Sequence, residues 1–362
     1  MKYKAVFARG GTSKALVFHA KDLPQDRAQW DRIFVAAMGS PDPYGRQLDG
    51  MGGGVSSLSK VCVVGPASRP DADVDYTFAQ VQVKEARVDY QGNCGNMSSA
   101  IGPFAVDEGL VRVQDGNATV RIHNTNTKKI IHAVFPVADG ASVEAGGLAI
   151  PGVSGTGAPV RLDFLDPGGA STGKLLPTGN VIDKLAAIEA SLVDAANACV
   201  FIEAAALGLT GRELPTELEE KPEVLQRLAE LRARGARAMG LPKSDFIPLI
   251  AFVAAPQDTR TLAGETIPAS SADLVVRMIS NGQPHRALPL TGSLCTAVAC
   301  LVGGSIPHRL VRRERSGALR LAMPSGVLTV DADVRFEGGQ WRAARGSFYR
   351  TTRRLFEGFV HA

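Results

Sequence analysis

The segment Gly92-Asn93-Cys94-Gly95-Asn96 carries the sharpest chemical signal in the chain. A cysteine that opens a helix feels the positive end of the helix dipole and unpaired backbone N–H groups, and both favour the reactive thiolate. Glycine flanks let a substrate approach closely. A small buried residue is the plain alternative, but so polar a turn favours a functional thiol. The other four cysteines, Cys62, Cys199, Cys295 and Cys300, lie in apolar runs typical of inert thiols.

Two further polar segments could serve anionic ligands. The run RGGTSK (9–14) places hydroxyls, flexible backbone and positive charge between two strand-like stretches. It fits a carboxylate cradle, or else a tight hairpin with exposed polar groups. Downstream, Ser56, Ser57 and Ser59 precede Lys60, which opens the apolar strand KVCVVG. A lysine at a strand end is most often a solvated charge, so the residues alone favour that interpretation of Lys60.

Motifs for nucleotide, metal and hydrolase sites are incomplete or missing in the sequence. The segment 168–174 (GGASTGK) starts like a phosphate loop, but Leu175 replaces the magnesium-binding hydroxyl and Pro177 blocks the following helix. An anion-binding turn using Ser171, Thr172 and Lys174 stays open beside a plain loop. The glycine run 50–54 does not close the dinucleotide spacing. The six histidines are scattered and no GxSxG occurs, so we expect neither a metal site nor a hydrolase triad.

Composition narrows the class of protein. The chain has 362 residues, 45% of them hydrophobic and 21% charged, which excludes wholesale disorder and suggests two domains. A net charge of +4 is too small to indicate nucleic acid, and we interpret the basic clusters 232–237 and 312–315 as solvated faces. No apolar run is long enough to span a bilayer, and the N-terminus lacks a signal-peptide core. Five cysteines without a CxxC pair favour a reducing cytoplasm.

The positions of turn residues and apolar runs predict a strand-rich protein with few helices. Strands are expected at 60–65, 75–83, 119–124, 129–137, 161–165, 251–254 and 273–279. The clearest helix runs from 222 to 239, with Val224, Leu228 and Leu231 on one face and no assigned chemistry. Two shorter helices, at 97–108 and 294–301, each follow a turn of small residues.

These two short helices share a pattern that indicates an internal repeat. CGNMSSAIG and TGSLCTAVA match when aligned on glycine, which sets Cys94 opposite Thr291. We therefore predict an α+β protein of two pseudo-symmetric halves, each with a strand-rich sheet around one central helix. The first half comprises 1–180 plus 346–362 and the second comprises 181–345. The site is expected in the cleft between the halves.

The ordered motifs resemble one family. RGGTSK, SSLSK, DYTFAQ, GNCGN, HNTNT, STGKLLPTGN, TGSLCTA and the closing GSFYRTTRRLFEG are similar to those of the PrpF-like isomerases, over nearly the whole chain. Members include methylaconitate cis-trans isomerase, methylitaconate Δ-isomerase and 4-oxalomesaconate tautomerase. The resemblance implies a diaminopimelate-epimerase-like fold and a cofactor-independent isomerase that acts on unsaturated di- and tricarboxylates.

The resemblance also implies roles for individual residues. Lys60 matches the general base and Cys94 matches the active-site cysteine. Substrate contacts are expected at Thr12, Ser13, Lys14, Gly95, Asn96, Ser171, Thr172, Gly173, Lys174, Arg277, Ser280, Thr291, Gly292 and Ser293. Lys60 would remove an allylic proton, helix N-termini would stabilise the dienolate, and Lys60 or Cys94 would return the proton two carbons away.

Several residues depart from the family pattern and leave the substrate open. Thr291 stands where racemases of this fold carry a second cysteine, Asn281 stands where many members have methionine, and Ala15 replaces a usual glycine. DYTFAQVQV and IHNTNT favour the methylitaconate branch weakly. Two alternatives stay open: an accessory protein of an iron–sulfur hydratase, and a racemase or epimerase of the same fold. The expected partner is a small carboxylate, with neither nucleic acid nor membrane, and a homodimer is expected from the prevalence of symmetric pairs.

Overall fold

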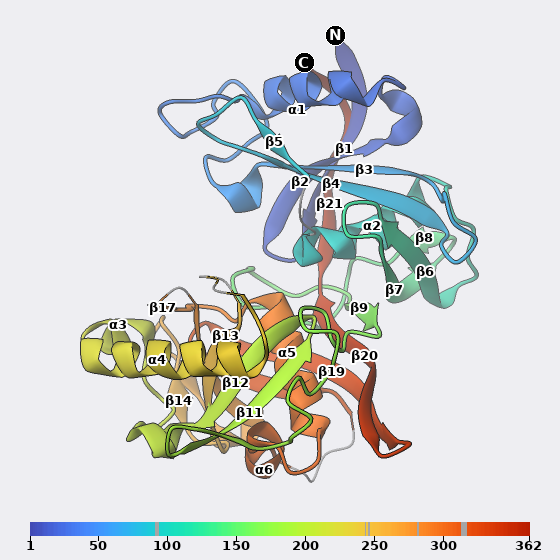
Figure 1. Ribbon diagram of the computed structural model, residues 1–362. Helices are drawn as coiled ribbons and strands as arrows, with labels where there is room; N and C mark the ends of the chain where they lie inside the picture. The colour runs from blue at the N-terminus through green and yellow to red at the C-terminus, as the bar shows by residue number, and fades with distance from the viewer. Residues whose placement is uncertain (91–93, 243, 245–246, 281, 313–316) are drawn as a thin grey trace. The chain divides into compact units, whose positions relative to one another are not determined.

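The structure is a computed structural model that describes residues 1–90, 94–242, 244, 247–280, 282–312 and 317–362. Asn93 of the predicted active-site turn, Asn281, and residues 313–315 of the basic cluster lie outside the described residues. The chain forms two compact units, Met1–Asp163 with Tyr349–Ala362, and Phe164–Phe348 (Figure 1). The predicted division lay at 180/181 and 345/346. The structure assigns 164–180 to the second unit, where the loop 168–172 binds strand residue Asp194.

Unit 1 is a mixed sheet whose strands follow one another in a regular pattern. Pairing is antiparallel between β1 and β2, parallel between β2 and β3, antiparallel between β3 and β4, parallel between β4 and β6, and antiparallel between β6 and β7. Strand β21 returns from the end of the chain to pair with β1. The strands are β1 (Lys2–Gly10), β2 (Ser13–His19), β3 (Lys60–Pro66), β4 (Val74–Val81), β5 (Val88–Asp89), β6 (Gly116–Asn124), β7 (Lys129–Ala138), β8 (Ala141–Ser142), β9 (Val160–Leu165) and β21 (Thr352–His361). The helices are α1 (Trp30–Met38) and α2 (Gly95–Asp107).

Unit 2 repeats this pattern strand for strand. Pairing is antiparallel between β11 and β12, parallel between β12 and β13, antiparallel between β13 and β16, parallel between β16 and β18, and antiparallel between β18 and β19. The strands are β10 (Asp183–Leu185), β11 (Ile188–Ala195), β12 (Asn197–Glu203), β13 (Leu249–Ala254), β14 (Thr259–Arg260), β15 (Thr266–Ile267), β16 (Leu274–Ser280), β17 (Gln283–Pro284), β18 (Leu319–Met323), β19 (Gly326–Glu337) and β20 (Gln340–Arg350). The helices are α3 (Pro215–Glu219), α4 (Pro222–Ala238), α5 (Leu290–Leu301) and α6 (Ile306–Leu310).

The repeat extends to individual side chains. In unit 1, Asp73 accepts hydrogen bonds from the backbone N–H of Arg121 (2.7 Å) and from its guanidinium Nη2 (2.6 Å). In unit 2, Asp273 does the same with Arg320, at 2.9 and 2.8 Å. In each unit the aspartate directly precedes one strand of a parallel pair and binds an arginine of the other strand. The two strand pairs are β4–β6 and β16–β18. The pairing order and these matching aspartate–arginine pairs confirm the predicted α+β architecture of two similar halves.

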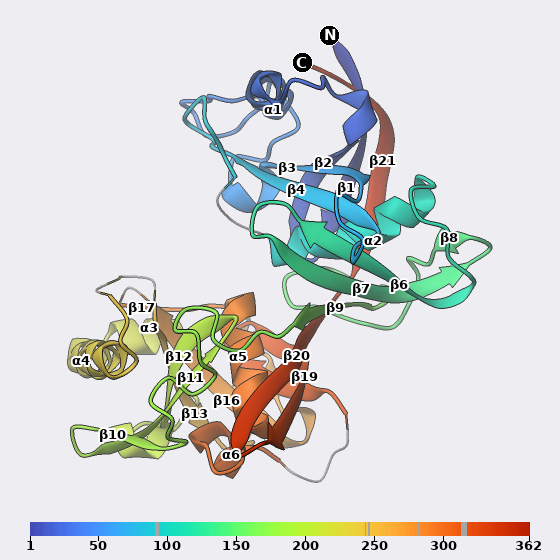
Figure 2. The same ribbon diagram turned by 45° about the vertical axis from the view of Figure 1, so that its right-hand side comes forward.

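Each sheet is covered by helices on both faces, as Figures 1 and 2 show for unit 1, where α1 and α2 lie on opposite sides of the strands. Helix α1 packs on a core that includes Leu16, Phe18, Val61 and Val63. Successive strand residues point to opposite faces, so Ser13, Ala15, Lys60 and Cys62 point toward the α2 face. Helix α2 accordingly contacts β1, β2 and β3.

Unit 2 has the same layers. Leu228 and Leu231 of α4 are buried in one core with Val200, Ile250 and Phe252, as expected for an amphipathic helix. The opposite face carries α5, which contacts β11, β12 and β19. Every residue from Met97 to Val106 in α2 and from Gly292 to Cys300 in α5 is buried. Helices apolar on all sides belong in a core, which explains why these two stand at the centre of their units.

The helix starts differ slightly from the prediction. Helix α2 begins at Gly95 with Cys94 as its N-cap, and α5 begins at Leu290 with Pro289 as its N-cap. Thr291, Gly292 and Ser293 therefore lie inside the first turn instead of before it. Small residues fit there because first-turn N–H groups need no intrahelical acceptor. In the described part of the chain, no helix combines the length and the apolar character needed to cross a membrane.

Candidate active site

Lys60 is buried at the start of β3. Only 7% of the residue is exposed, and its Nζ donates a hydrogen bond to Oε1 of Gln80, directly opposite on β4. The ammonium group also lies 5.2 Å from the centroid of the Phe78 ring. The interpretation as a solvated strand-end charge is therefore wrong, because the side chain is buried against Gln80 and Phe78 of β4.

Gln80 is fixed in the orientation that serves Lys60. Its Nε2 donates to three backbone carbonyls, those of Ser56 (3.1 Å), Ser59 (3.0 Å) and Val81 (3.3 Å). With the amide nitrogen held in this way, the oxygen must face Lys60. Sequence reasoning quoted Gln80 within DYTFAQ but gave it no role. The signal that could have found it is the antiparallel register that sets Lys60 opposite Gln80.

Cys94 caps the N-terminus of α2 on the same face of the sheet. Its side chain is half-buried, and its Sγ lies 4.0 Å from the hydroxyl of Ser13. The first intrahelical bond runs from Ser98 N–H to the Cys94 carbonyl, so the N–H groups of Gly95 and Asn96 have no acceptor within the helix. A thiolate or a substrate carboxylate at this point meets backbone donors and the positive end of the dipole.

Lys60 and Cys94 both lie beside β2 on the α2 face. Lys60 pairs with Ala15, and the Cys94 Sγ lies 4.0 Å from the hydroxyl of Ser13, two residues earlier on β2. Burial raises the pKa of the Cys62 thiol, the charge of Cys94 raises it further, and the charge of Lys60 lowers it. Since Cys62 is two residues after Lys60 on β3, both side chains point to the α2 face. The predicted base and the predicted cysteine thus occupy one site within unit 1.

The RGGTSK segment divides between the two faces of the sheet. Ser13 is buried beside Cys94, and exposed Thr12 accepts a hydrogen bond from Asn96 Nδ2 (3.1 Å). Lys14 points to the α1 face, where its Nζ lies 5.4 Å from the centroid of the Phe7 ring. The alternation of strand residues causes this separation. The geometry supports Thr12 and Ser13 as site residues and argues against Lys14.

The predicted residues around Asp194 and Thr291 lie in unit 2. The backbone N–H groups of Ser171 and Thr172 each donate to Oδ2 of Asp194 at 2.7 Å, and the Thr172 hydroxyl donates at 2.9 Å. These donors of the predicted anion-binding turn bind a carboxylate of this chain itself. Gly173 and Lys174 are exposed beside it. A role of this loop in substrate binding stays a prediction.

The first turn of α5 resembles that of α2 in part. Thr291 is exposed and accepts a hydrogen bond from Asn197 Nδ2 at 3.3 Å, whereas Gly292 and Ser293 are buried. The Ser293 hydroxyl donates to the Leu290 carbonyl (2.8 Å) within the helix. The geometry therefore leaves Thr291 as the accessible hydroxyl of this turn, and substrate contact by the three residues stays a prediction.

Arg277 is part of the core of unit 2. It is 1% exposed and donates to the carbonyls of Glu213 (2.6 Å) and Val276 (3.0 Å) and to the hydroxyl of Thr259 (3.0 Å). Burial lowers the pKa of its guanidinium to about 10. These bonds join β13–β16 to the loop before α3, which argues against direct contact with substrate. Ser280 ends β16, and its side chain lies outside the described residues.

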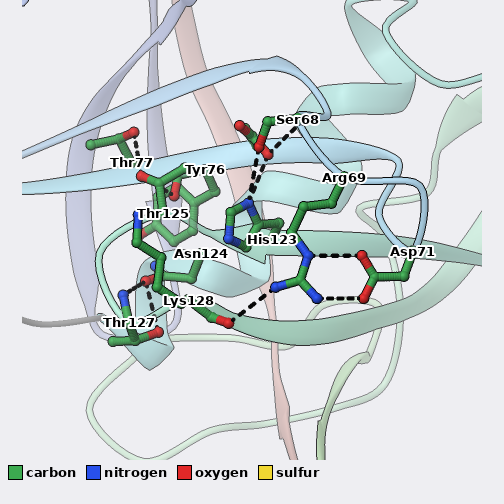
Figure 3. Close-up of polar contacts among 11 residues, drawn as sticks. Ser68, Arg69, Asp71, Tyr76, Thr77, His123, Asn124, Thr125, Thr127 and Lys128 are labelled. Carbon is green, nitrogen blue, oxygen red and sulfur yellow. Dashed lines mark hydrogen bonds and ion pairs between the residues drawn. The ribbon is translucent and has the colours of Figure 1, made fainter.

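The HNTNT motif lies at the turn between β6 and β7, next to Tyr76 and Thr77 of β4 (Figure 3). The Asn124 side chain accepts hydrogen bonds from the N–H (2.8 Å) and the hydroxyl (2.9 Å) of Thr127, which closes the β6–β7 turn. Asn126 pairs with both backbone groups of Phe78, at 2.8 Å each, and also donates to the Tyr90 carbonyl (2.6 Å). The motif thus anchors the strand that presents Phe78 and Gln80 to Lys60.

The repeat supplies an internal control for Lys60. Lys60 opens β3 and lies beside Ala15, the third residue of β2. In unit 2, Leu249 opens β13 and lies beside Cys199, the third residue of β12. Leu249 is also buried near the start of its central helix, because a Cβ on Gly292 would be 2.9 Å from Leu249 Cδ1. The fold therefore accepts an apolar side chain at this place and does not require an amine.

A second difference between the units concerns Arg350. The N–H of Gly11 donates to the Thr351 carbonyl, and in unit 2 the N–H of Ala196 donates to the Pro167 carbonyl. Gly11 and Ala196 occupy matching turns and share a positive φ, at 51° and 59°. The acceptors Thr351 and Pro167 therefore occupy matching positions. The residues directly before them match as well, and these are Arg350 in unit 1 and Asp166 in unit 2. Arg350 is buried, whereas the Asp166 side chain is 70% exposed.

No group of three or more potential metal-ligating His, Cys, Asp or Glu side chains occurs among the residues that the structure describes. The site is instead a lysine, a cysteine, hydroxyl and amide side chains, and helix-start N–H groups, all in unit 1. Such a set can move a proton on a carbon acid and stabilise the resulting negative charge.

Comparison with known proteins agrees with this chemistry. The chain matches the family described as PrpF protein over residues 1–362. It is 39% identical to 3-methylitaconate isomerase of Eubacterium barkeri, over 100% of this chain and 97% of that protein. It is 36% identical to 2-methyl-aconitate isomerase of Shewanella oneidensis, over 99% of this chain and 96% of that protein. The crystal structure of methylitaconate-delta-isomerase superposes with a TM-score of 0.92 at 39% identity, covering 99% of this chain and 95% of that one. The family resemblance noted from the motifs is thereby confirmed: the chain belongs to the PrpF family.

Proposed function

We propose that this protein is a cofactor-independent isomerase that moves a double bond in an unsaturated di- or tricarboxylate by a 1,3-proton shift. The observation that carries the proposal is buried Lys60, aimed by Gln80 toward the α2 face, in a position where the repeat places Leu249. A fold that accepts leucine there does not need the lysine for stability. This favours a chemical role for Lys60, and a base beside helix-start donors suits proton abstraction next to a carboxylate.

The mechanism follows from the arrangement in unit 1. Lys60 in its amine form takes a proton from the carbon that is both allylic and adjacent to a carboxylate. The electron pair spreads into a dienolate, whose negative charge is stabilised by the N–H groups of Gly95 and Asn96 and the Ser13 hydroxyl. The lysine ammonium or the Cys94 thiol then delivers a proton to the far end of the allyl system. One proton leaves the substrate and one returns, so the reaction is redox-neutral. Where the Cys94 thiol is the donor, proton exchange with solvent afterwards returns Lys60 to its amine form and Cys94 to its thiol form.

The substrate class is proposed from the relatives and the donors at the site. The relatives are named for isomerisation of 3-methylitaconate and 2-methyl-aconitate, and both names denote unsaturated carboxylates. We take methylitaconate, methylaconitate and 4-oxalomesaconate as the candidate substrates. We also propose a cytoplasmic location, because the five cysteines of the chain are all free thiols, and a homodimeric state.

Proton NMR in D₂O tests the proposal directly. The purified protein is incubated with each candidate acid, and wild type is compared with Lys60→Ala and with Lys21→Ala, which removes an exposed lysine that has no role in the proposed mechanism. We expect the alkene signal to move and deuterium to enter the product in wild type and Lys21→Ala, and neither change in Lys60→Ala. Deuterium entry at a stereocentre without alkene movement would indicate a racemase instead, and no turnover of any acid would favour an accessory role.

A further inference from the structure

The loop that joins α1 to β3, residues 39–59, leads directly into Lys60 and has no role in the mechanism above. Near its middle lies Gln47, which is only 1% exposed, although loop residues usually face solvent. Gln47 also has a φ of +53°, a left-handed backbone that is uncommon for residues other than glycine and costs free energy. A buried polar side chain on a strained backbone indicates that the surrounding structure holds this residue in a particular place.

The Gln47 side chain connects separate parts of the loop. Its Oε1 accepts hydrogen bonds from the N–H of Gly54 (2.9 Å) and from the hydroxyl of Ser59 (2.6 Å), and its Nε2 donates to the hydroxyl of Ser40 (2.9 Å). The backbone N–H of Gln47 donates to the carboxylate of Asp42. Both ends of the loop, at Ser40 and at Ser59, are therefore held by one amide.

The glycine run 50–54 packs closely around this amide. A Cβ on Gly52 would be 2.3 Å from Cδ of Gln47, a distance at which something must shift. A Cβ on Gly53 would be 2.7 Å from Cδ1 of Leu58, in the turn just before Ser59. The glycines thus leave the space that the Gln47 side chain and the end of the loop occupy.

The end of the loop is bonded to the partner of Lys60. The carbonyl of Ser59 accepts hydrogen bonds from Nε2 of Gln80 (3.0 Å) and from the N–H of Val81 (3.1 Å). Oε1 of Gln80 in turn accepts the hydrogen bond from Nζ of Lys60. A series of hydrogen-bonded residues therefore runs from Gln47 through Ser59 and Gln80 to Lys60.

The repeat shows that the fold does not require this loop. In unit 2 the helix and strand that match α1 and β3 are α4 and β13, and the much shorter segment 239–248 joins them. That segment leads into Leu249, which stands in the place of Lys60. The long loop thus occurs in the unit that has the lysine, which indicates that the loop serves the lysine.

We propose that Gln47 is a positioning residue of the active site, which holds the Lys60 amine in place through Ser59 and Gln80. Gln47 keeps the Ser59 carbonyl where it binds the Gln80 amide, and the Gln80 oxygen then faces Lys60. A catalytic base has to be held within about 0.5 Å of its productive geometry by such supporting hydrogen bonds. The effect on turnover rests on the proposed function, whereas the effect on Lys60 does not.

A double-mutant cycle tests whether Gln47 acts through Gln80. The cycle compares wild type, Gln47→Leu, Gln80→Met and the double variant. Gln47→Leu removes the amide, and the Ser59 hydroxyl keeps an acceptor in the Val55 carbonyl (2.9 Å). The matched control is Leu48→Ser, because Leu48 lies in the same loop and is 73% exposed.

We expect Gln47→Leu to lower kcat about five- to tenfold, the equivalent of about one hydrogen bond. KM should not change, because a side chain this buried does not contact the substrate. In the Gln80→Met background the same substitution should lower kcat less than about twofold, since the connection to Lys60 is already broken. Leu48→Ser should match wild type. An equal loss in both backgrounds would show a merely structural role and overturn the proposal, and so would a wild-type kcat in folded Gln47→Leu.

Ser59→Ala decides the matter if Gln47→Leu fails to fold. It removes one hydroxyl from the same connection and should lower kcat about threefold when Gln80 is present and not in the Gln80→Met background. No loss, or an equal loss in both backgrounds, would overturn the proposal.

Labelling of Lys60 by acetic anhydride, measured by peptide mass spectrometry, tests the connection without any substrate. Gln47→Leu should label about fivefold faster than wild type, because the Lys60 amine leaves its contact with Gln80 more often. In an enzyme inert on every acid, faster labelling would refute the proposed function alone. An unchanged labelling rate would overturn the positioning role of Gln47.

Discussion

Replacing Gln80 by glutamate tests the base more sharply than deleting Lys60. The substitution preserves shape but places a carboxylate where the Lys60 ammonium now donates to an amide oxygen. Two unit charges at about 4 Å interact by about 4 kcal/mol at an effective dielectric constant near 20. Since 1.36 kcal/mol corresponds to one pH unit, the upper limit is about 3 units. Gln80 is half-buried, and screening by solvent reduces the expected shift to about 1 to 2 units.

The sign of the effect follows from the proposed mechanism. Lys60 acts as the amine, and a neighbouring carboxylate stabilises the ammonium, so the active form requires a higher pH. We expect the rising limb of the kcat/KM–pH profile to move up by about 1 to 2 units, with a loss of about 10- to 100-fold at pH values below it. Activity should recover above the displaced limb.

Two companion variants separate charge from structure. Gln80→Met removes the acceptor without adding charge, so kcat should fall while the limb does not move upward. Gln114→Glu adds the same charge at an exposed position and should match wild type. Both Gln80 variants lose the donor that serves three carbonyls, so each is first compared with wild type by urea unfolding. An unmoved limb in folded Gln80→Glu would refute Lys60 as the base.

Three further predictions concern the scaffold. Asp273→Ala should reduce the free energy of unfolding by about 3 to 5 kcal/mol, because it leaves Arg320 without its buried partner. Asp73→Ala should reduce it less, since the Asp73 side chain is 24% exposed and that of Asp273 is 1% exposed. Equal losses in urea unfolding would contradict this. Gly11→Ala should lower the free energy of unfolding by about 1 to 2 kcal/mol, because the backbone of Gly11 is left-handed. It should also lower kcat, because the added Cβ displaces Asn96. Wild-type kinetics would contradict the close fit of Gly11 to Asn96. Burial raises the pKa of Glu213, but hydrogen bonds from the N–H groups and hydroxyl around Thr210 outweigh it and leave the pKa below 4.5. Its stabilisation is therefore present above pH 4.5 and lost as the pH falls, so the melting temperature of Glu213→Gln should decline less steeply between pH 5 and 3 than that of wild type.

The architecture could be predicted from the sequence because its signals are local. Short β-branched runs gave the positions of most long strands, and two similar small-residue turns revealed the repeat. The sequence places the starts of α2 and α5 a few residues late, because Gly95 and the run 291–293 resemble a turn by composition. These residues in fact occupy the first helical turn, where the N–H groups need no intrahelical acceptor.

The site was only partly predictable, because its decisive contacts join residues far apart in sequence. Burial of Lys60 depends on Gln80, twenty residues away, and the position of Asn96 depends on Arg350, 254 residues away. No local pattern marks either partner. Lys14 shows the opposite effect: its neighbours Thr12 and Ser13 lie next to Asn96 and Cys94, but strand alternation turns Lys14 toward Phe7 on the α1 face. Substrate contact by these three residues stays a prediction.

The repeat separates what the fold needs from what the reaction needs. The same strand order and the same aspartate–arginine ion pair occur in both units, so these features build the scaffold. Lys60, Cys94 and Arg350 occur in unit 1, where the corresponding residues of unit 2 are Leu249, Thr291 and Asp166. Racemisation by two thiols needs a cysteine at each helix start, and Thr291 supplies a hydroxyl that is far too weak an acid to take that part. A proton shift along an allyl system needs one base and one set of donors for the dienolate. Unit 1 provides both, so the asymmetry of the repeat favours allylic isomerisation over racemisation.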